Sequence, residues 1–120
     1  MSSHQAVLDL THAYLRAVYG GDVAALKQVF HEGARVEDTA TGAFRSRSAG
    51  EYIQAVGSRQ SPKAAGEAFT MAPVSIEVHG DSASVTADLR FLGNHYVNIL
   101  AMAIVEGHWR IVHKLFSAVA

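Results

Sequence analysis

Residues 69–118, FTMAPVSIEVHGDSASVTADLRFLGNHYVNILAMAIVEGHWRIVHKLFSA, decide the fold of this chain. Apolar side chains take alternate positions here, most regularly between Ala83 and Phe91, which is the period of a strand with one buried face. Residues typical of tight turns divide the stretch at positions 79–81, 93–94 and 106–107. The pattern therefore predicts four consecutive strands joined as an antiparallel meander.

The first sixty residues have the period of helices instead. Apolar side chains recur at three- and four-residue steps from Val7 to Val18, and the glycines at 20–21 end this first predicted helix. A short second helix is predicted over 22–31, with an aspartate as its N-cap. The sequence SAGE at 48–51 matches a capping box and predicts a third helix that ends at Gly57.

Two shorter segments lie between the second and third predicted helices. Alternation over 34–38 predicts a strand, and residues 39–47 are polar with a glycine, which indicates a loop or a short hairpin. Helices followed by an antiparallel sheet predict an α+β fold with the helices packed on one face of the sheet. We expect a single domain over residues 1–120.

Composition argues against several classes of protein. Ten Lys+Arg against eleven Asp+Glu, without a basic run, argue against nucleic acid or a membrane surface as a partner. The chain has no cysteine, and its seven histidines lack metal-ligand spacing, so we predict no disulfide, no metal site and no cofactor. With no signal peptide and no apolar run of ~20 residues, a cytoplasmic location is expected.

The strand predicted over Tyr96–Val105 is apolar on both faces. A strand with one solvated face alternates with polar residues, so this one is expected to be covered twice. The helices cover one face, and a second copy of the chain is the economical cover for the other. The sequence therefore predicts a homodimer joined through the outer face of the sheet.

Two groups of residues resemble the NTF2-like superfamily. They are Tyr14, Gly21-Asp22, Leu26, Phe30, Ala34 and Val36-Glu37-Asp38 near the start, and the run GHWRIVHKLF at 107–116. The closing run is most similar to the SnoaL-like, "putative lumazine-binding" branch. The resemblance implies a cone in which a curved, mainly antiparallel sheet wraps three helices, and a dimer through the outer sheet face. It implies no single activity, since the cone hosts isomerases, dehydratases, cyclases, hydrolases and binding modules.

A partial resemblance to the steroid delta-isomerase branch concerns the spacing of Tyr14, Asp22, Phe30 and Asp38. It implies Tyr14 as a hydrogen-bond donor to a developing enolate oxygen and Asp38 as the base that moves the proton. That branch also has a protonated aspartate on the third meander strand. Counting back from Gly107 places Ala101 or an apolar neighbour at that position.

Asp38 shares a strand face with Val36, so its carboxylate is expected to point into the cone and to pair with Tyr14 or Lys114. His113 alternates with Ile111 and Leu115 in the last predicted strand, so these three side chains are expected to point outside the cone, opposite to Lys114. Walls of an apolar ligand cavity are predicted from seven residues: Val18, Phe30, Tyr52, Phe91, Val112, Lys114 and Phe116. Of these, Phe30 and Phe116 fit plain core packing better than ligand contact, and Lys114 either pairs with Asp38, the role that is favoured, or holds an acidic ligand.

Three functions are compatible with this arrangement. The first is the binding of a small hydrophobic or aromatic ligand in an apolar cavity. The second is acid–base catalysis on such a ligand, as in an isomerase, dehydratase or cyclase that needs no cofactor. The third is a dimeric interaction module whose cone is filled by side chains. A cavity of ~300 Å³ or more that reaches Asp38 would favour the first two.

Overall fold

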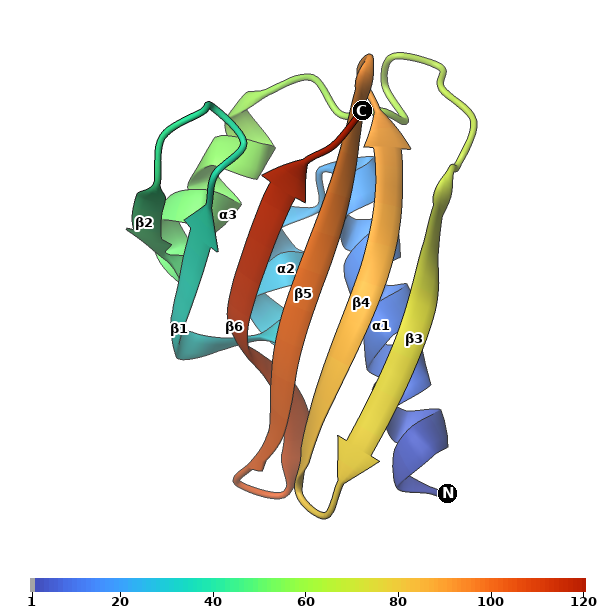
Figure 1. Ribbon diagram of the computed structural model, residues 1–120, viewed down its shortest axis with the longest axis vertical. Helices are drawn as coiled ribbons and strands as arrows, with labels where there is room; N and C mark the ends of the chain where they lie inside the picture. Colours follow the sequence, from blue (N-terminus) through green and yellow to red (C-terminus); the bar gives the residue numbers. More distant parts are fainter. Residues whose placement is uncertain (1) are drawn as a thin grey trace.

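One six-stranded sheet, in the order β2-β1-β6-β5-β4-β3, carries three helices on a single face (Figure 1). The computed structural model describes residues 2–120. Its elements are α1 (Ser3–Gly20), α2 (Val23–Val29), β1 (Phe30–Asp38), β2 (Arg45–Ser48), α3 (Ala49–Ser58), β3 (Met71–His79), β4 (Ser82–Phe91), β5 (Asn94–Val105) and β6 (His108–Ala118). The predicted α+β class is confirmed, and the space between the helices and the inner face of the sheet is called the cone interior below.

The predicted meander is confirmed, since β3, β4, β5 and β6 pair antiparallel in chain order. β1 joins the sheet in parallel with β6 and antiparallel with β2. The second helix is shorter than predicted, because Phe30 already pairs with Ile111 of β6. Strand pairing here overrides the local helical period. The segment expected to be a loop or short hairpin contains the edge strand β2.

Side chains at the helix starts account for where the three helices begin. The hydroxyl of Ser2 and the carboxylate of Asp22 accept backbone N–H groups at the starts of α1 and α2. At α3, Ser48 and Glu51 form the predicted reciprocal capping box. Gly21 ends α1 with a φ of 63°, a left-handed conformation that favours glycine.

A bulge at Val112 changes which β6 side chains face the cone. Met102 pairs with Ile111 and Ala101 with His113, so one β6 residue is left over between them. Ile111 is therefore fully buried, whereas strict alternation predicted it to face outward. His113 lies outside the cone as predicted, with Nε2 2.9 Å from Glu37 Oε1. This contact lowers the pKa of the Glu37 carboxyl below its ordinary value.

Most of the core is apolar, and it lies between α1, α3 and the inner face of the sheet. Among residues 2–120, four polar or charged side chains are buried with it: Thr11, Asp38, Asn98 and Lys114. Thr11 satisfies its hydroxyl on the carbonyl of Val7 within α1. The other three require partners from other elements, because burying an unpaired polar group is costly. None of the described helices is long and apolar enough to cross a membrane.

Candidate functional site

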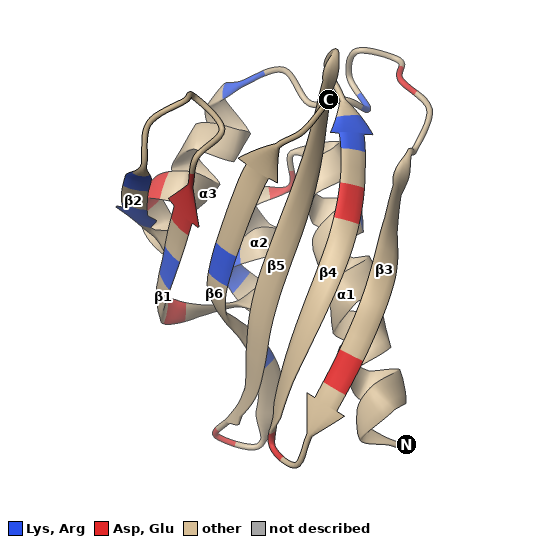
Figure 2. Cartoon of the chain, viewed as in Figure 1, with Lys and Arg blue, Asp and Glu red and all other residues tan. Residues whose placement is uncertain are grey.

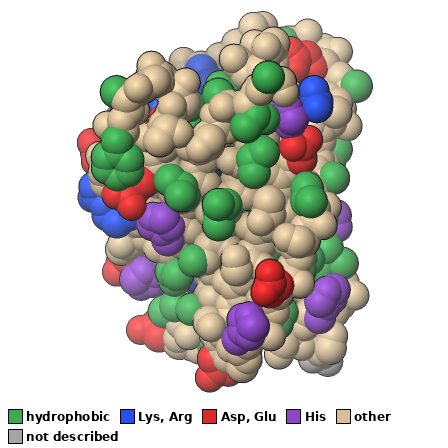
Figure 3. Space-filling view, viewed as in Figure 1, with side chains coloured by type: hydrophobic (Ala, Val, Ile, Leu, Met, Phe, Trp, Pro, Cys, Tyr) green, Lys and Arg blue, Asp and Glu red, His purple; other side chains and the backbone are tan. Residues whose placement is uncertain are grey.

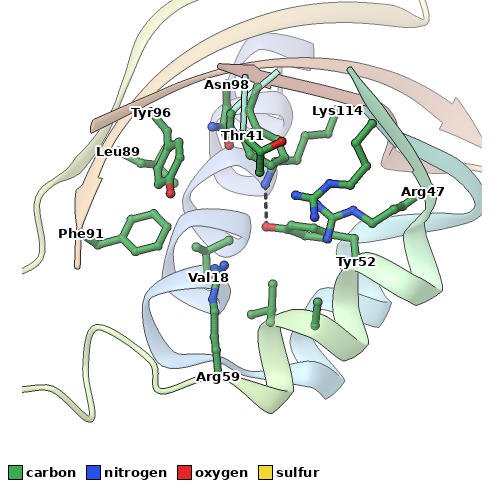
Figure 4. A pocket seen from close by; sticks show the side chains of 15 residues that line it. Val18, Thr41, Arg47, Tyr52, Arg59, Leu89, Phe91, Tyr96, Asn98 and Lys114 are labelled. Atoms are coloured by element: carbon green, nitrogen blue, oxygen red, sulfur yellow. Dashed lines mark hydrogen bonds between the residues drawn. The ribbon is translucent and has the colours of Figure 1, made fainter. Parts of the chain in front are cut away.

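A cavity of about 300 Å³ opens at the end of the cone where β1 runs into β2 (Figure 4). Its walls come from the inner sheet face, α3 and the loop after β1. Aromatic and aliphatic side chains form one part of the wall: Val18, Tyr52, Val56, Leu89, Phe91, Tyr96 and Phe116. The cavity is therefore large enough for a small ring compound, and the cone is not filled by its own side chains.

Positive charge dominates the remainder of the wall. Arg45 and Arg47 enter from β2, Arg59 from the end of α3 and Lys114 from β6. Figure 4 shows the ends of Arg47, Arg59 and Lys114 directed into the same space. No aspartate or glutamate is among the described residues that line the cavity. The predicted apolar cavity is thus apolar on one side only.

Asp38 lies behind this wall and is fully buried. Its Oδ2 accepts hydrogen bonds from Arg45 Nε at 2.9 Å and Arg47 Nη2 at 3.4 Å, and its Oδ1 accepts the N–H of Ala40 at 3.1 Å. Its burial agrees with the prediction, but its hydrogen-bond partners are arginines rather than Tyr14 or Lys114. The strand register explains the difference, since Arg45 pairs with Asp38 and Arg47 with Val36 on the inward side of β2. Figure 2 shows the basic β2 beside the acidic end of β1.

Not all N–H groups of the Arg47 guanidinium have a hydrogen-bond partner in this arrangement. Its Nη2 contacts Asp38, and its guanidinium carbon lies 5.5 Å from the centre of the Tyr52 ring. Its Nε is buried and has no hydrogen-bond partner among the described residues. Burial, and then the neighbouring charge of Arg45, lower the pKa of Arg47. A buried N–H without an acceptor costs free energy that a bound acceptor would recover.

Lys114 is buried with its Nζ against three aromatic rings. Nζ donates to Tyr52 Oη at 2.5 Å and lies 4.0, 4.7 and 5.2 Å from the ring centres of Tyr52, Phe116 and Tyr14. The pKa of Lys114 is lowered well below its ordinary value, first by burial and then by the charges of Arg59 and Arg47. The more distant carboxylate of Asp38 acts in the opposite direction.

Tyr14 lies behind the cavity wall rather than on it. Its hydroxyl donates to Asn98 Oδ1 at 2.5 Å, and Asn98 does line the cavity. Burial, with the neighbouring Tyr52, raises the pKa of Tyr14 well above its ordinary value. Sequence reasoning missed Asn98, although it alternates with Leu100 and Met102 and therefore shares their inward face.

Five of the seven residues predicted to contact a ligand line the cavity: Val18, Tyr52, Phe91, Lys114 and Phe116. Phe30 does not, because it is packed edge-on against the rings of Tyr14 and Tyr52, with ring centres 6.0 and 5.9 Å apart. Val112 does not, because it occupies the β6 bulge. The three arginines were missed, although Arg45 and Arg47 have the i, i+2 spacing that places two charges on one strand face.

The arrangement fits the binding of an anion more readily than proton abstraction by Asp38. Both oxygens of that carboxylate already accept hydrogen bonds, and the Tyr14 hydroxyl proton is engaged by Asn98. Within residues 2–120, no group of three or more histidine, aspartate or glutamate side chains is placed to hold a metal ion. The groups that remain free to meet a ligand are cationic or aromatic.

Comparisons with known proteins agree with this fold. Two crystal structures of NTF2-like proteins of unknown function are similar. One, from Silicibacter pomeroyi DSS-3, has 24% identity and a TM-score of 0.83 over 99% of this chain and 100% of that one. The other, from Shewanella baltica OS155, has 16% identity and a TM-score of 0.85 over 100% and 98%.

A CaMKII hub from S. rosetta is also similar, with 18% identity and a TM-score of 0.72 over 99% and 98% of the two chains. No curated protein matches the sequence significantly. The model of the family described as "Putative lumazine-binding" matches residues 2–117. The chain therefore belongs to that family, and its fold is that of the NTF2-like proteins.

Proposed function

We propose that this protein binds a small aromatic ligand that carries a carboxylate or a comparable anionic group. The observation that carries the proposal is the charge of the cavity: its wall holds three arginines and the amine of Lys114 and, among its described lining residues, no carboxylate. Cations gathered in a partly dehydrated space repel one another, and an anion relieves that repulsion. The ligand class is thus narrower than the hydrophobic or aromatic one expected from sequence.

The arginines provide the geometry for an anion as well as the charge. A guanidinium binds a carboxylate through two parallel N–H groups, and such charge-assisted hydrogen bonds are about twice as strong as neutral ones. Arg59 forms no ion pair with the described residues and stacks over Phe91 at 5.3 Å. Arg47 holds an unpartnered Nε close by. These two side chains are the proposed anchors of the anionic group.

The aromatic wall accounts for the rest of the ligand. Tyr96 packs between Phe91 and Phe116, with ring centres 5.3 and 5.8 Å away. The first pair is tilted and the second is edge to face, and flat rings already held in contact accept a further ring at low conformational cost. The family description names lumazine, a fused heteroaromatic ring system, which shares the aromatic part of the proposed ligand but has no carboxylate.

Calorimetric titration with benzoate and with benzamide, its neutral analogue, tests the proposal. Benzoate is expected to bind about tenfold or more tightly, because only the carboxylate forms charge-assisted hydrogen bonds. Arg59→Gln is expected to remove most of that difference, since Arg59 has no structural ion pair to disturb. Arg90→Gln on the outer side of β4 is the matched control. Equal affinity for benzoate and benzamide would refute the proposal.

The acid–base alternative with Asp38 as base is not favoured, because the arginines occupy its carboxylate. A filled interaction module is not favoured either, given the volume of the cavity. Asp38 itself is not among the residues that line the cavity, which reaches its partners Arg45 and Arg47 instead, so the expected volume is present without the expected contact to Asp38.

We further propose that the protein is a homodimer through the outer sheet face. Figure 3 shows apolar side chains scattered over this face of the molecule, with few charges near its centre. Ile99 lies at the middle of β5, is 45% exposed, and pairs with Leu115 of β6. An exposed apolar surface of this kind is typical of an interface.

Light scattering tests the dimer. We expect about twice the 12.8 kDa chain mass for the wild type and a monomer for Ile99→Glu, because a buried charge without a partner opposes association. Gln28→Glu on the exposed side of α2, away from the outer sheet face, is the control and should remain dimeric. A monomeric wild type at micromolar concentration would exclude this interface.

A further inference from the structure

We propose that Lys114 Nζ forms an imine with the carbonyl carbon of the ligand, so that the cavity takes a small aldehyde or ketone that also carries a carboxylate. This inference rests on the proposed function, because the arginines must hold the carboxylate while Lys114 reacts. It adds a covalent step that binding alone does not require.

The surroundings of Lys114 favour a neutral amine. An ammonium group has three N–H donors to satisfy, and Nζ has one hydrogen-bond partner among the described residues, Tyr52 Oη. Arg47 and Arg59 add positive charge from β2 and α3, and the carboxylate of Asp38 is taken up by Arg45 and Arg47. The aromatic rings attract a cation by about 1–2 kcal/mol, which is less than the several kcal/mol that removing the charge from water costs.

The hydrogen bond to Tyr52 leaves the reactive electrons free. Nζ donates one N–H to Tyr52 Oη, so its lone pair is available to a carbonyl carbon in the cavity. Burial raises the pKa of the Tyr52 hydroxyl, which keeps the phenol protonated. Tyr52 can therefore donate its own proton to an oxygen that leaves beside Nζ. The same residue orients the amine and assists the departure of water.

The step balances without an oxidant or a second reactant. The Nζ lone pair forms a bond to the carbonyl carbon, and the carbonyl π electrons move to oxygen. That oxygen takes a proton released by the attacking nitrogen, which gives a neutral carbinolamine. Its hydroxyl then leaves as water with a proton supplied by Tyr52, while the nitrogen lone pair forms the C=N bond. Loss of the last N–H proton to the phenolate gives the neutral imine and restores Tyr52.

The positions of Lys114 and of two arginines indicate which class of carbonyl compound would fit the cavity. Lys114 comes from β6, and Arg47 and Arg59 come from β2 and α3 around the same space (Figure 4). A ligand whose carboxylate contacts the guanidiniums can thus present a second group to Nζ. A rigid ring with the two groups at opposite ends suits a cavity of about 300 Å³ whose wall is partly aromatic.

Reductive trapping with 4-formylbenzoate tests the inference on the intact wild-type protein. Cyanoborohydride reduces an imine to a stable secondary amine, and peptide mapping by mass spectrometry then locates it. The chain has two other lysines, Lys27 and Lys63, both exposed, which serve as internal controls. At pH 7 we expect at least tenfold more adduct on Lys114 than on either of them, because exposed lysines are almost fully protonated there.

The pH dependence separates a reactive amine from a merely accessible one. The neutral fraction of an ordinary exposed amine falls by about tenfold per unit between pH 9 and pH 7, and the adduct on such an amine should fall with it. The adduct on Lys114 should fall much less. The groups that face Nζ are Tyr14, Tyr52, Arg47, Arg59 and, at longer range, Asp38, and none of them gives Nζ a directly bonded carboxylate.

Variants and a binding control make the outcomes distinct. Tyr52→Phe should form the Lys114 adduct several-fold more slowly when the rate is compared at equal occupancy of the cavity, which its own benzoate titration sets, and Lys63→Arg should change neither benzoate binding nor the adduct. If benzoate binds and Lys114 carries no more adduct than Lys27, the imine is excluded and the proposed function stands. If benzoate fails to bind and no adduct forms, both are wrong.

Discussion

Replacing both Arg45 and Arg47 with alanine is expected to lower the free energy of unfolding by about 3–5 kcal/mol. The reason is the fully buried Asp38 carboxylate, whose charged partners among the described residues are these two guanidiniums. Without them a charge remains in the core with one backbone N–H as its donor. Urea denaturation followed by circular dichroism measures the loss.

A third substitution shows whether the unpaired charge of Asp38 causes this loss of stability. Adding Asp38→Asn to the double variant should recover part of the lost stability, because a neutral amide avoids the cost of the buried charge. Arg35→Ala, on the exposed side of β1, removes only a hydrogen bond to Ser46 and should cost under about 1 kcal/mol. A double variant as stable as Arg35→Ala would show that the arginines do not support Asp38.

Lys114→Met is expected to act in the opposite direction and stabilise the fold by about 1–4 kcal/mol at pH 7. Methionine fills a similar volume without a polar atom that must be removed from water. The gain comes at the cost of the proposed chemistry, since the variant lacks the amine and its N–H donors in the cavity. Benzoate affinity and the trapped adduct should both decrease in a protein that unfolds at a higher temperature.

The pH dependence of the stability difference between Lys114→Met and the wild type shows whether that difference arises from a neutral, buried Lys114. Because the pKa of folded Lys114 lies well below 10.5, the unfolded chain binds a proton between those two values that the folded chain does not. Wild-type stability therefore rises with pH across this window, by up to about tenfold in the unfolding equilibrium constant per unit. The advantage of Lys114→Met should shrink as pH rises toward 10.5. A constant advantage would mean that Lys114 is charged when folded.

Much of the fold could be predicted because alternation and capping are local signals. The meander and the α3 capping box lie where the sequence placed them. The residue at which α2 ends could not be predicted, since it depends on the pairing of Phe30 with β6. The inward orientation of the Ile111 side chain could not be predicted either, since it depends on the bulge in β6. Both are decided by strands distant in the sequence.

For a similar reason, the aromatic part of the candidate site could be predicted from the sequence and its charged part could not. Its aromatic wall follows from the apolar faces of α3, β4 and β6, which were recognised. Its charge depends on β2, a four-residue strand whose polar sequence RSRS lacks the apolar alternation that identifies a strand. The inward orientation of Asn98 could have been predicted from alternation alone, but the rest of β5 is apolar on both faces and does not distinguish the inward face.

The position of β2 at the edge of the sheet has a consequence for how the cavity is entered and closed. This strand is short, has one neighbouring strand, and carries two of the three arginines that line the cavity. Short edge elements with few buried contacts separate from a protein at lower free energy than the whole chain unfolds. We therefore expect the proposed anion-binding wall to open more readily than the central strands of the sheet. Ligand capture and edge-strand docking then form one linked equilibrium, in which occupancy of the cavity holds the edge of the sheet in place.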